Sequence, residues 1–157
     1  MILLGIDPGY ADMGFGVLQR VAGKEKCLAY GSVRTAKGES AEKRLAALHR
    51  KLSALVEKYK PDAAGVEKLF FSSNTKSAMQ VAEARGVILA CLELHGVPVT
   101  EFLPSHVKIA VTGHGAAKKP EMQKMVRVLL GLKDIPKPDD AADALAIAVA
   151  LAYMKRR

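Results

Sequence analysis

The segment that most restricts the fold of this chain is the apolar run at residues 2–6, which ends on the carboxylate of Asp7 directly before a Pro-Gly turn. A short apolar run bounded by turn residues predicts a buried β-strand. A carboxylate at the end of such a strand is costly to desolvate unless a cation or hydrogen bonds compensate its charge. Because the turn at Pro8 and Gly9 leaves Asp7 at the edge of the sheet, a metal ion or a phosphate can reach it. An Asp that only caps the turn is the alternative interpretation.

The remaining pattern predicts strands in the first third of the chain and helices that alternate with strands after it. Strands are expected at residues 2–7, 13–18, 27–35, 62–67 and 97–102, the first three as an antiparallel meander. Helices are expected at residues 40–60, 75–94, 104–111, 120–130 and 139–154. A chain of 157 residues is long enough to build one core. We therefore expect an α/β fold in a single domain that spans residues 1–157.

The predicted helix at residues 75–94 carries small residues at every fourth position, namely Ala78, Ala82, Gly86 and Ala90. A stripe of small side chains lets another backbone approach the helix closely. That backbone belongs either to the sheet or to the same helix of a second subunit, and the sequence leaves both possibilities open.

The charge balance favours a polyanionic partner. The net charge is +8 and the isoelectric point is near 9.6, which favours nucleic acid over a membrane surface. No signal-peptide pattern and no apolar run of membrane-spanning length is visible. Cys27 and Cys91 lack metal-type spacing and lie in apolar surroundings, so we expect buried free thiols in a reducing cytoplasm.

Three further carboxylates stand where they can share a site with Asp7. Glu67 ends the predicted strand at residues 62–67, while Asp140 and Asp143 lie three residues apart on one face of the last predicted helix. Asp139 is expected as the N-cap of that helix, although it also lies one turn from Asp143. Capping does not account for Asp143, a charge that lies one turn into an otherwise apolar helix.

Carboxylate oxygens are the ligands that hard divalent cations prefer, and no His/Cys cluster indicates zinc. Four carboxylates around one cleft can hold two Mg²⁺ ions about 4 Å apart, with Mn²⁺ as a substitute, which is an arrangement used for phosphodiester hydrolysis. Without metal the carboxylates repel one another, and this repulsion raises the pKa of at least one of them.

Four segments of the chain resemble, in order and spacing, the RuvC family of Holliday-junction resolvases. They are Gly5-Ile6-Asp7-Pro8-Gly9, Val66-Glu67-Lys68-Leu69-Phe70, Ala84-Arg85-Gly86 and Asp140-Ala141-Ala142-Asp143-Ala144-Leu145-Ala146. The resemblance implies a ribonuclease H-like fold with a five-stranded mixed sheet flanked by helices. It also implies a homodimer with two active sites that makes paired symmetric nicks in a four-way DNA junction, and cooperation with the RuvA–RuvB branch-migration complex.

By the same resemblance, the catalytic, metal-binding carboxylates are Asp7, Glu67, Asp140 and Asp143, so the family match selects Asp140 over Asp139. The lysines that match those contacting the scissile DNA backbone are Lys108 and Lys119, with Lys118 as the alternative to Lys119. The aromatic residue that matches the family's DNA wedge is Phe70. The roles of Phe71 and His114 stay open.

Other function classes compete with this interpretation. The Asp7-Pro8-Gly9 turn followed by Gly14 resembles the phosphate-binding hairpin of actin- and sugar-kinase-type ATPases, but those proteins need two such lobes. A different ribonuclease H-like nuclease, acting on RNA or duplex DNA, would use the same carboxylates. A junction-binding module without catalysis would need the acidic residues only as helix caps.

Overall fold

The computed structural model describes residues 1–68 and 75–155. Its core is a five-stranded sheet with the strand order β3-β2-β1-β4-β5. The strands are β1 (Ile2–Asp7), β2 (Asp12–Val21), β3 (Lys24–Arg34), β4 (Ala63–Glu67) and β5 (Val99–Phe102). The first three strands pair antiparallel, whereas β4 runs parallel to both β1 and β5. This confirms the predicted mixed sheet and the antiparallel meander.

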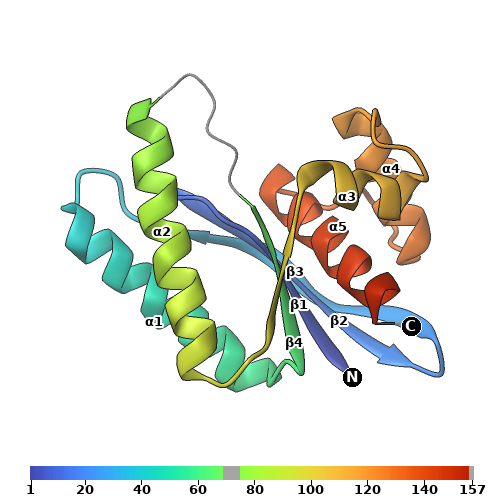
Figure 1. Ribbon diagram of the computed structural model, residues 1–157, viewed down its shortest axis with the longest axis horizontal. Helices are drawn as coiled ribbons and strands as arrows, with labels where there is room; N and C mark the ends of the chain where they lie inside the picture. Colours follow the sequence, from blue (N-terminus) through green and yellow to red (C-terminus); the bar gives the residue numbers. More distant parts are fainter. Residues whose placement is uncertain (69–74, 156–157) are drawn as a thin grey trace.

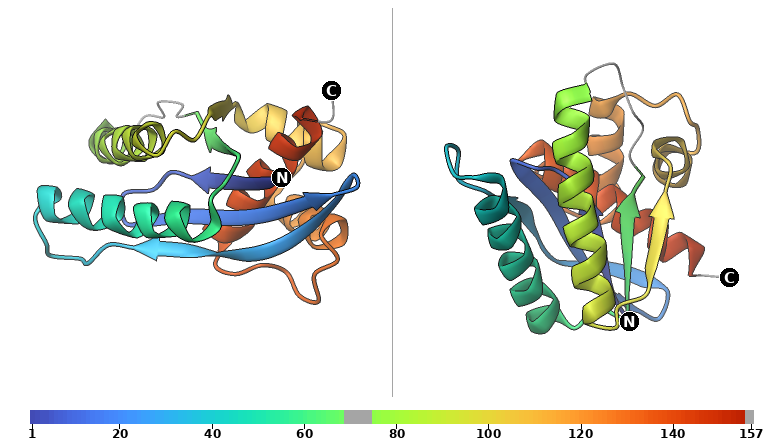
Figure 2. Two further views of the ribbon diagram at one scale, coloured as in Figure 1. Left: turned by 90° about the horizontal axis from the view of Figure 1, so that it is seen from below. Right: turned by 60° about the vertical axis from the view of Figure 1, so that its left-hand side comes forward.

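Helices cover both faces of this sheet, as Figure 1 and the turned views in Figure 2 show. The helices are α1 (Ala41–Tyr59), α2 (Thr75–Leu94), α3 (Pro104–Thr112), α4 (Lys119–Leu129) and α5 (Asp139–Met154). The buried side chains form two clusters, one beneath α1 and α2 and the other beneath α3, α4 and α5. The layers are therefore helices, sheet and helices, as expected for a ribonuclease H-like fold.

Predicted and observed element boundaries differ by a few residues where backbone hydrogen bonds decide them. The last strand begins at Val99 rather than at residue 97, because the Val97 amide donates to the Leu92 oxygen at the end of α2. Gly96, with φ 67°, makes the left-handed turn that permits this contact. The β2–β3 turn lies at Ala22 and Gly23, which both have positive φ.

The α1 and α2 face is packed through branched and long side chains. Leu48 and Leu52 of α1 and Ile88 of α2 are at most 1% exposed and belong to one cluster with Leu4 and Ile6 of β1. Burying such a side chain contributes about 1.5–3 kcal/mol. This face supplies much of the side-chain volume of the core.

The opposite face has glycines in the strands and alanines in α5. A Cβ placed on Gly5 would lie 2.1 Å from the Ala144 backbone oxygen and 2.6 Å from the Ala148 nitrogen. A Cβ on Gly16, the cross-strand partner of Gly5, would lie 2.9 Å from the Cα of Leu145. Since these distances are too short for real contacts, the backbone of α5 approaches β1 and β2 closely at Gly5 and Gly16, where a strand side chain would not fit.

The small-residue stripe of α2 does not coincide with the side of the helix that faces the core. Among the described residues of α2, those buried are Ala84, Ile88, Cys91 and Leu92, whereas Gly86 and Ala90 of the stripe are exposed. The first possibility, packing of the stripe on the sheet, is therefore wrong at these two positions.

Among the predicted buried thiols, Cys91 is buried but Cys27 is only half-buried, and both are free.

Strand β3 forms one edge of the sheet and is the longest strand, with 11 residues. Its pairing with β2 shifts register between Val17 and Leu18, which marks a β-bulge.

In the part of the chain described here, no helix combines the length and apolarity needed to cross a membrane.

Candidate active site

Two of the predicted carboxylates lie side by side because their strands are parallel neighbours. Asp7 ends β1 and Glu67 ends β4, and the register pairs Ile6 with Val66 immediately before them. Carboxyl ends of adjacent parallel strands meet at one edge of a sheet, where ligands commonly bind. The structure therefore places both carboxylates at this edge.

The start of α5 brings Asp140 and Asp143 to the same edge. Burial, followed by the charges of Glu67, Asp143 and Asp140, raises the pKa of Asp7 from 3.8 to about 8. These couplings require the four carboxylates to lie near one another. The predicted grouping of Asp7, Glu67, Asp140 and Asp143 is thus present in the structure.

Two other members of the group share this perturbation. Burial, followed by the charge of Asp143, raises the pKa of Glu67, while Lys108 lowers it. Burial, followed by the charges of Asp12 and Asp143, raises the pKa of Asp140, while Lys119 lowers it. Without a cation, burial and mutual repulsion therefore disfavour the charged forms of these carboxyl groups.

The Lys119 ammonium group places a positive charge beside the carboxylates and so offsets part of their negative charge. Its Nζ lies 3.2 Å from Asp143 Oδ2 and 3.3 Å from Asp139 Oδ2. Burial opposes the charged form of this lysine, but the hydrogen bonds and charges of the two aspartates prevail and raise its pKa. Lys119 is the first residue of α4, so this contact joins α4 to the start of α5.

The predicted cap of α5 is wrong. The helix begins at Asp139 and its N-cap is Pro138, which has no side chain able to cap the helix. The Asp139 carboxylate instead pairs with Lys119 and accepts a hydrogen bond from Gln123 Nε2 at 3.1 Å. A tertiary contact with α4 takes the place of the capping that the sequence predicts.

A hollow of about 220 Å³ opens beside the carboxylates. Its lining residues are Glu67, Pro104, Val107, Lys108, Lys119, Met122, Asp143 and Ala146. Two carboxylates therefore face two lysines across a space whose remaining wall is apolar. Lys118, the N-cap of α4, is exposed and is not part of this wall.

The donor atoms of the site fit a hard divalent cation by their chemistry. All four grouped side chains offer carboxylate oxygens, the ligands that Mg²⁺ and Mn²⁺ prefer. The raised pKa of Asp7 shows that these oxygens lack a compensating charge. Among the described residues, however, no three Asp, Glu, His or Cys side chains are arranged to hold an ion as they stand. Lys119 is bound to Asp143 instead.

Phe70, the predicted DNA wedge, and Phe71 lie outside the described residues. His114 lies in an exposed turn, where its Nε2 is 2.7 Å from Glu121 Oε1. His114 does not line the hollow beside the carboxylates.

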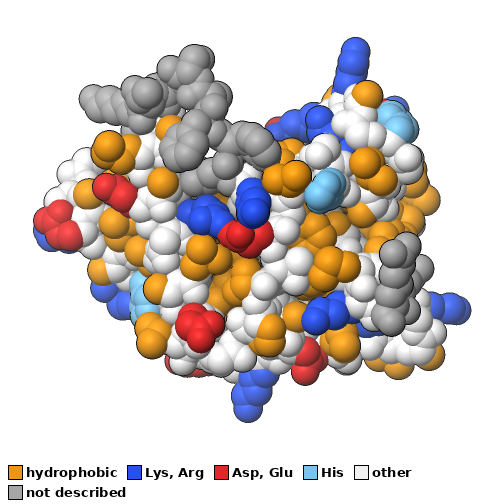
Figure 3. All heavy atoms as spheres, viewed as in Figure 1, with side chains coloured by type: hydrophobic (Ala, Val, Ile, Leu, Met, Phe, Trp, Pro, Cys, Tyr) orange, Lys and Arg blue, Asp and Glu red, His pale blue; other side chains and the backbone are white. Residues whose placement is uncertain are grey.

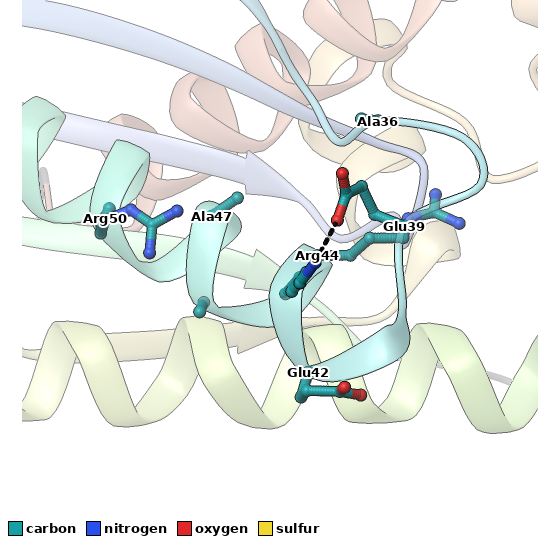
Figure 4. A pocket seen from close by; sticks show the side chains of 8 residues that line it. Ala36, Glu39, Glu42, Arg44, Ala47 and Arg50 are labelled. Atoms are coloured by element: carbon teal, nitrogen blue, oxygen red, sulfur yellow. Dashed lines mark ion pairs between the residues drawn. The ribbon is translucent and has the colours of Figure 1, made fainter.

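A larger hollow, of about 540 Å³, lies away from the carboxylates, between residues 36–39 and the outer side of α1. Figure 4 shows its lining, where Glu39 and Glu42 lie among basic side chains and Glu39 forms an ion pair with Lys43. On the face of the molecule seen in Figure 3, the Lys and Arg side chains are scattered rather than gathered in one patch. Neither feature adds residues to the carboxylate site.

Sequence reasoning missed Asp12, whose charge raises the pKa of Asp140. Asp12 begins β2 and also pairs with Arg34, with a distance of 2.9 Å between Nε and Oδ1. In the sequence it looks like any acidic residue in a turn. Only the placement of α5 over the start of β2 brings it near Asp140.

The fold and the grouped carboxylates define a class of protein, the nucleases with a ribonuclease H-like fold. The profile of one family, described as crossover junction endodeoxyribonuclease RuvC, matches residues 3–151. This chain therefore belongs to the RuvC family of crossover junction endodeoxyribonucleases.

Individual relatives agree with this assignment over nearly the whole chain. The RuvC of Chloroflexus aggregans is 49% identical over 153 residues, which cover 98% of this chain and 93% of that protein. The RuvC of Brevibacillus brevis is 47% identical over 155 residues, which cover 99% and 93%. A solved structure of Thermus thermophilus RuvC in complex with a Holliday junction substrate superposes with a TM-score of 0.90 at 35% identity, covering 99% of this chain and 96% of that one.

Proposed function

We propose that this protein resolves four-way DNA junctions by hydrolysing one phosphodiester bond in each of two symmetric strands. Membership of the RuvC family supports the reaction class. The observation that carries the proposal is the group of carboxylates at the ends of β1 and β4 and the start of α5. Their mutual repulsion and burial bring the pKa of Asp7 to about 8, which is the electrostatic condition of a site built to hold cations.

We assign Asp7, Glu67, Asp140 and Asp143 as the ligands of two Mg²⁺ ions, for which Mn²⁺ can substitute. Such ions supply an activated water and stabilise the negative charge on the leaving oxygen. The protein itself contributes a rigid frame, because β1, β4 and α5 each fix the backbone of at least one ligand. The apolar wall formed by Val107, Met122 and Ala146 limits the water that reaches the site.

The lysines of the hollow have a different role in this proposal. Lys108 and Lys119 line the hollow together with Glu67 and Asp143, and an ammonium group there can bind the phosphates that flank the cleaved bond. Lys119 must leave Asp143 to do so, and its half-exposed side chain leaves room for that movement. Lys118 is the alternative to Lys119, and Phe70 is proposed to stack on bases at the junction centre.

We further propose a homodimer that uses the exposed side of α2, with residues 1–157 forming one domain in each subunit. Gly86 and Ala90 are exposed on this helix, and Met79 and Leu94 are 68% and 78% exposed. Small and apolar side chains on a helix surface allow close approach of a second helix. We also propose that this protein cooperates with the RuvA–RuvB complex and that it is located in the cytoplasm.

The decisive experiment is cleavage of a synthetic four-way DNA junction by the wild type and by Asp140→Asn, with Mg²⁺ or Mn²⁺. We expect paired nicks at symmetric positions from the wild type and a loss of about a thousandfold or more in the variant. The variant should still bind the junction, with affinity that falls as salt increases. Linear duplex DNA and single-stranded RNA of the same sequence serve as control substrates.

Each alternative class gives a different result in this experiment. Faster cutting of duplex DNA or RNA than of the junction would identify another ribonuclease H-like nuclease. Junction binding without cleavage in either metal would indicate a non-catalytic binding module. Cleavage that persists in Asp140→Asn would remove Asp140 from the site.

A further inference from the structure

The first turn of α5 lies directly on β2 at a position where β2 has no side chain. That position is Gly14, the cross-strand partner of Asp7 in the pairing of β1 with β2. A Cβ placed on Gly14 would lie 2.0 Å from the Asp140 backbone oxygen and 3.1 Å from the Asp140 Cβ. Gly14 therefore lies between two of the grouped carboxylates, Asp7 beside it on β1 and Asp140 above it on α5.

The group that Gly14 faces cannot move aside by itself. It is a backbone carbonyl in the first turn of α5, and the rigid peptide geometry of a helix fixes its position relative to the following residues. A side chain at residue 14 would therefore displace the whole turn. The displacement would carry Asp140 and Asp143 away from Asp7.

We infer that Gly14 is a positioning residue whose missing side chain sets how closely the first turn of α5 approaches β2, and thereby how closely the carboxylates of Asp140 and Asp143 approach that of Asp7. The inference rests on the proposed function in one respect, which is that these carboxylates bind divalent cations. Metal ligands must be held within about 0.5 Å of their productive places. A side chain at residue 14 would require a larger displacement than that.

Other glycines form a graded set of comparisons. Gly16 also faces α5, but its Cβ would meet the Leu145 Cα at 2.9 Å, a milder conflict further along the helix. A Cβ on Gly65 would meet no backbone atom this closely, only the side chains of Ile147 at 2.9 Å and Phe102 at 3.1 Å, and Ile147 lies further along α5 than Leu145. A Cβ on Gly115 would make only ordinary contacts, with the Ile109 side chain at 3.6 Å and 3.7 Å. The inference predicts effects on metal binding in the order Gly14, Gly16, Gly65 and Gly115.

The test is isothermal titration calorimetry of each Gly→Ala variant with Mg²⁺ and with Mn²⁺, in the absence of DNA. We expect Gly14→Ala to weaken Mg²⁺ binding at least tenfold, and Mn²⁺ binding less, because Mn²⁺ tolerates less ideal ligand geometry than Mg²⁺ does. Gly16→Ala should weaken Mg²⁺ binding by a smaller factor. Gly65→Ala and Gly115→Ala should stay within about twofold of the wild type, even if Gly65→Ala lowers the melting temperature as much as Gly14→Ala does.

Junction cleavage provides the second measurement. We expect Gly14→Ala to lose about a hundredfold in kcat, while its affinity for the junction in EDTA stays within about twofold. The inference is overturned if folded Gly14→Ala binds Mg²⁺ as tightly as the wild type. It is also overturned if Gly65→Ala loses Mg²⁺ affinity to the same degree.

Failure of the inference can be told apart from failure of the proposed function. If the wild type itself binds no divalent cation, the proposed function falls and the role of Gly14 falls with it. If the wild type binds Mg²⁺ and only the glycine series departs from the predicted order, the proposed function stands and the inference is wrong. Should Gly14→Ala fail to fold, Gly16→Ala decides, because unchanged Mg²⁺ affinity in that variant contradicts the inference.

Discussion

The two faces of the sheet hold their helices by different means. On one face, α1 and α2 contact the strands through side chains such as Leu48, Leu52 and Ile88. On the other, α5 contacts β1 and β2 through backbone, at Gly5 and Gly16. Side chains can repack around a small change, whereas two backbones in contact have no intervening atoms that can adjust.

This difference explains why the carboxylate site lies on the α5 face. Leu3 and Leu18 face the α5 cluster, while Leu4 and Ile6 face the α1 and α2 cluster. Alternation along β1 therefore turns Gly5 and Asp7 towards α5. The face with least freedom to repack is the one that positions charged groups, and the face with ordinary side-chain packing supplies general stability.

The largest effect is expected at Asp7, in metal-free protein. Its pKa is about 8 in the folded state, against 3.8 in the unfolded chain. Between these values the folded state binds a proton that the unfolded state has released, so the free energy of unfolding falls as the pH rises from about 4 to about 8. Asp7→Asn removes this penalty. We expect the variant to be more stable than the wild type by up to about 5 kcal/mol above pH 8, and nearly equal to it near pH 4.

Urea unfolding in EDTA at several pH values measures this difference. The exposed Asp134→Asn serves as the control for the loss of a surface carboxylate. Destabilisation by Asp7→Asn at every pH would contradict the electrostatic account of the α5 face.

The second prediction concerns the opposite face. Leu52 is 0% exposed on α1, and Leu52→Ala should cost about 2–5 kcal/mol because it leaves a cavity. The Mg²⁺ affinity of the folded variant should equal that of the wild type, since α1 does not position the carboxylates. Urea unfolding measures the stability and calorimetry the Mg²⁺ affinity, with Val128→Ala, at a side chain 61% exposed, as the control. Loss of Mg²⁺ affinity in Leu52→Ala would show that the two faces are not independent.

A smaller effect is expected from the lysine that stands beside α5. Lys119 pairs with Asp143 at 3.2 Å, so a cation that binds Asp143 must displace it. Lys119→Met should therefore tighten Mg²⁺ binding several-fold, by about 1 kcal/mol, while slowing junction cleavage. Lys118→Met is the matched control, because Lys118 is exposed and lies outside the wall of the hollow. Equal Mg²⁺ affinities in the two variants would contradict this competition.

The smallest effect is expected on the outer side of α1. Lys43 and Glu39 form an ion pair at 3.4 Å, with side chains 72% and 46% exposed. Solvent screens such pairs, so Lys43→Ala should change the free energy of unfolding by less than about 0.5 kcal/mol. Urea unfolding measures it, and a change in Mg²⁺ affinity in this variant would mean that the hollow in Figure 4 is connected to the site.

The sequence predicts the strands, the helices and the grouping of the carboxylates because each depends on local periodicity or on strand ends. It does not predict how a helix is rotated or how deeply it lies on the sheet. It therefore predicts Asp139 as a cap, although Asp139 pairs with Lys119. The small residues of α2 are compatible with either side of that helix. In the sequence Gly14 belongs only to a turn motif, because its proximity to Asp140 depends on where α5 crosses β2.

The long edge strand β3 has a consequence for solubility. The outer edge of β3, a strand of 11 residues, offers backbone donors and acceptors to which another chain can add as a further strand. Leu28 and Tyr30, 39% and 40% exposed, would add apolar contacts to such an assembly. The register shift against β2 and the exposed Lys24 and Lys26 oppose it, because bends and like charges prevent flat edges from pairing. Replacing those two lysines with neutral β-formers would therefore promote aggregation.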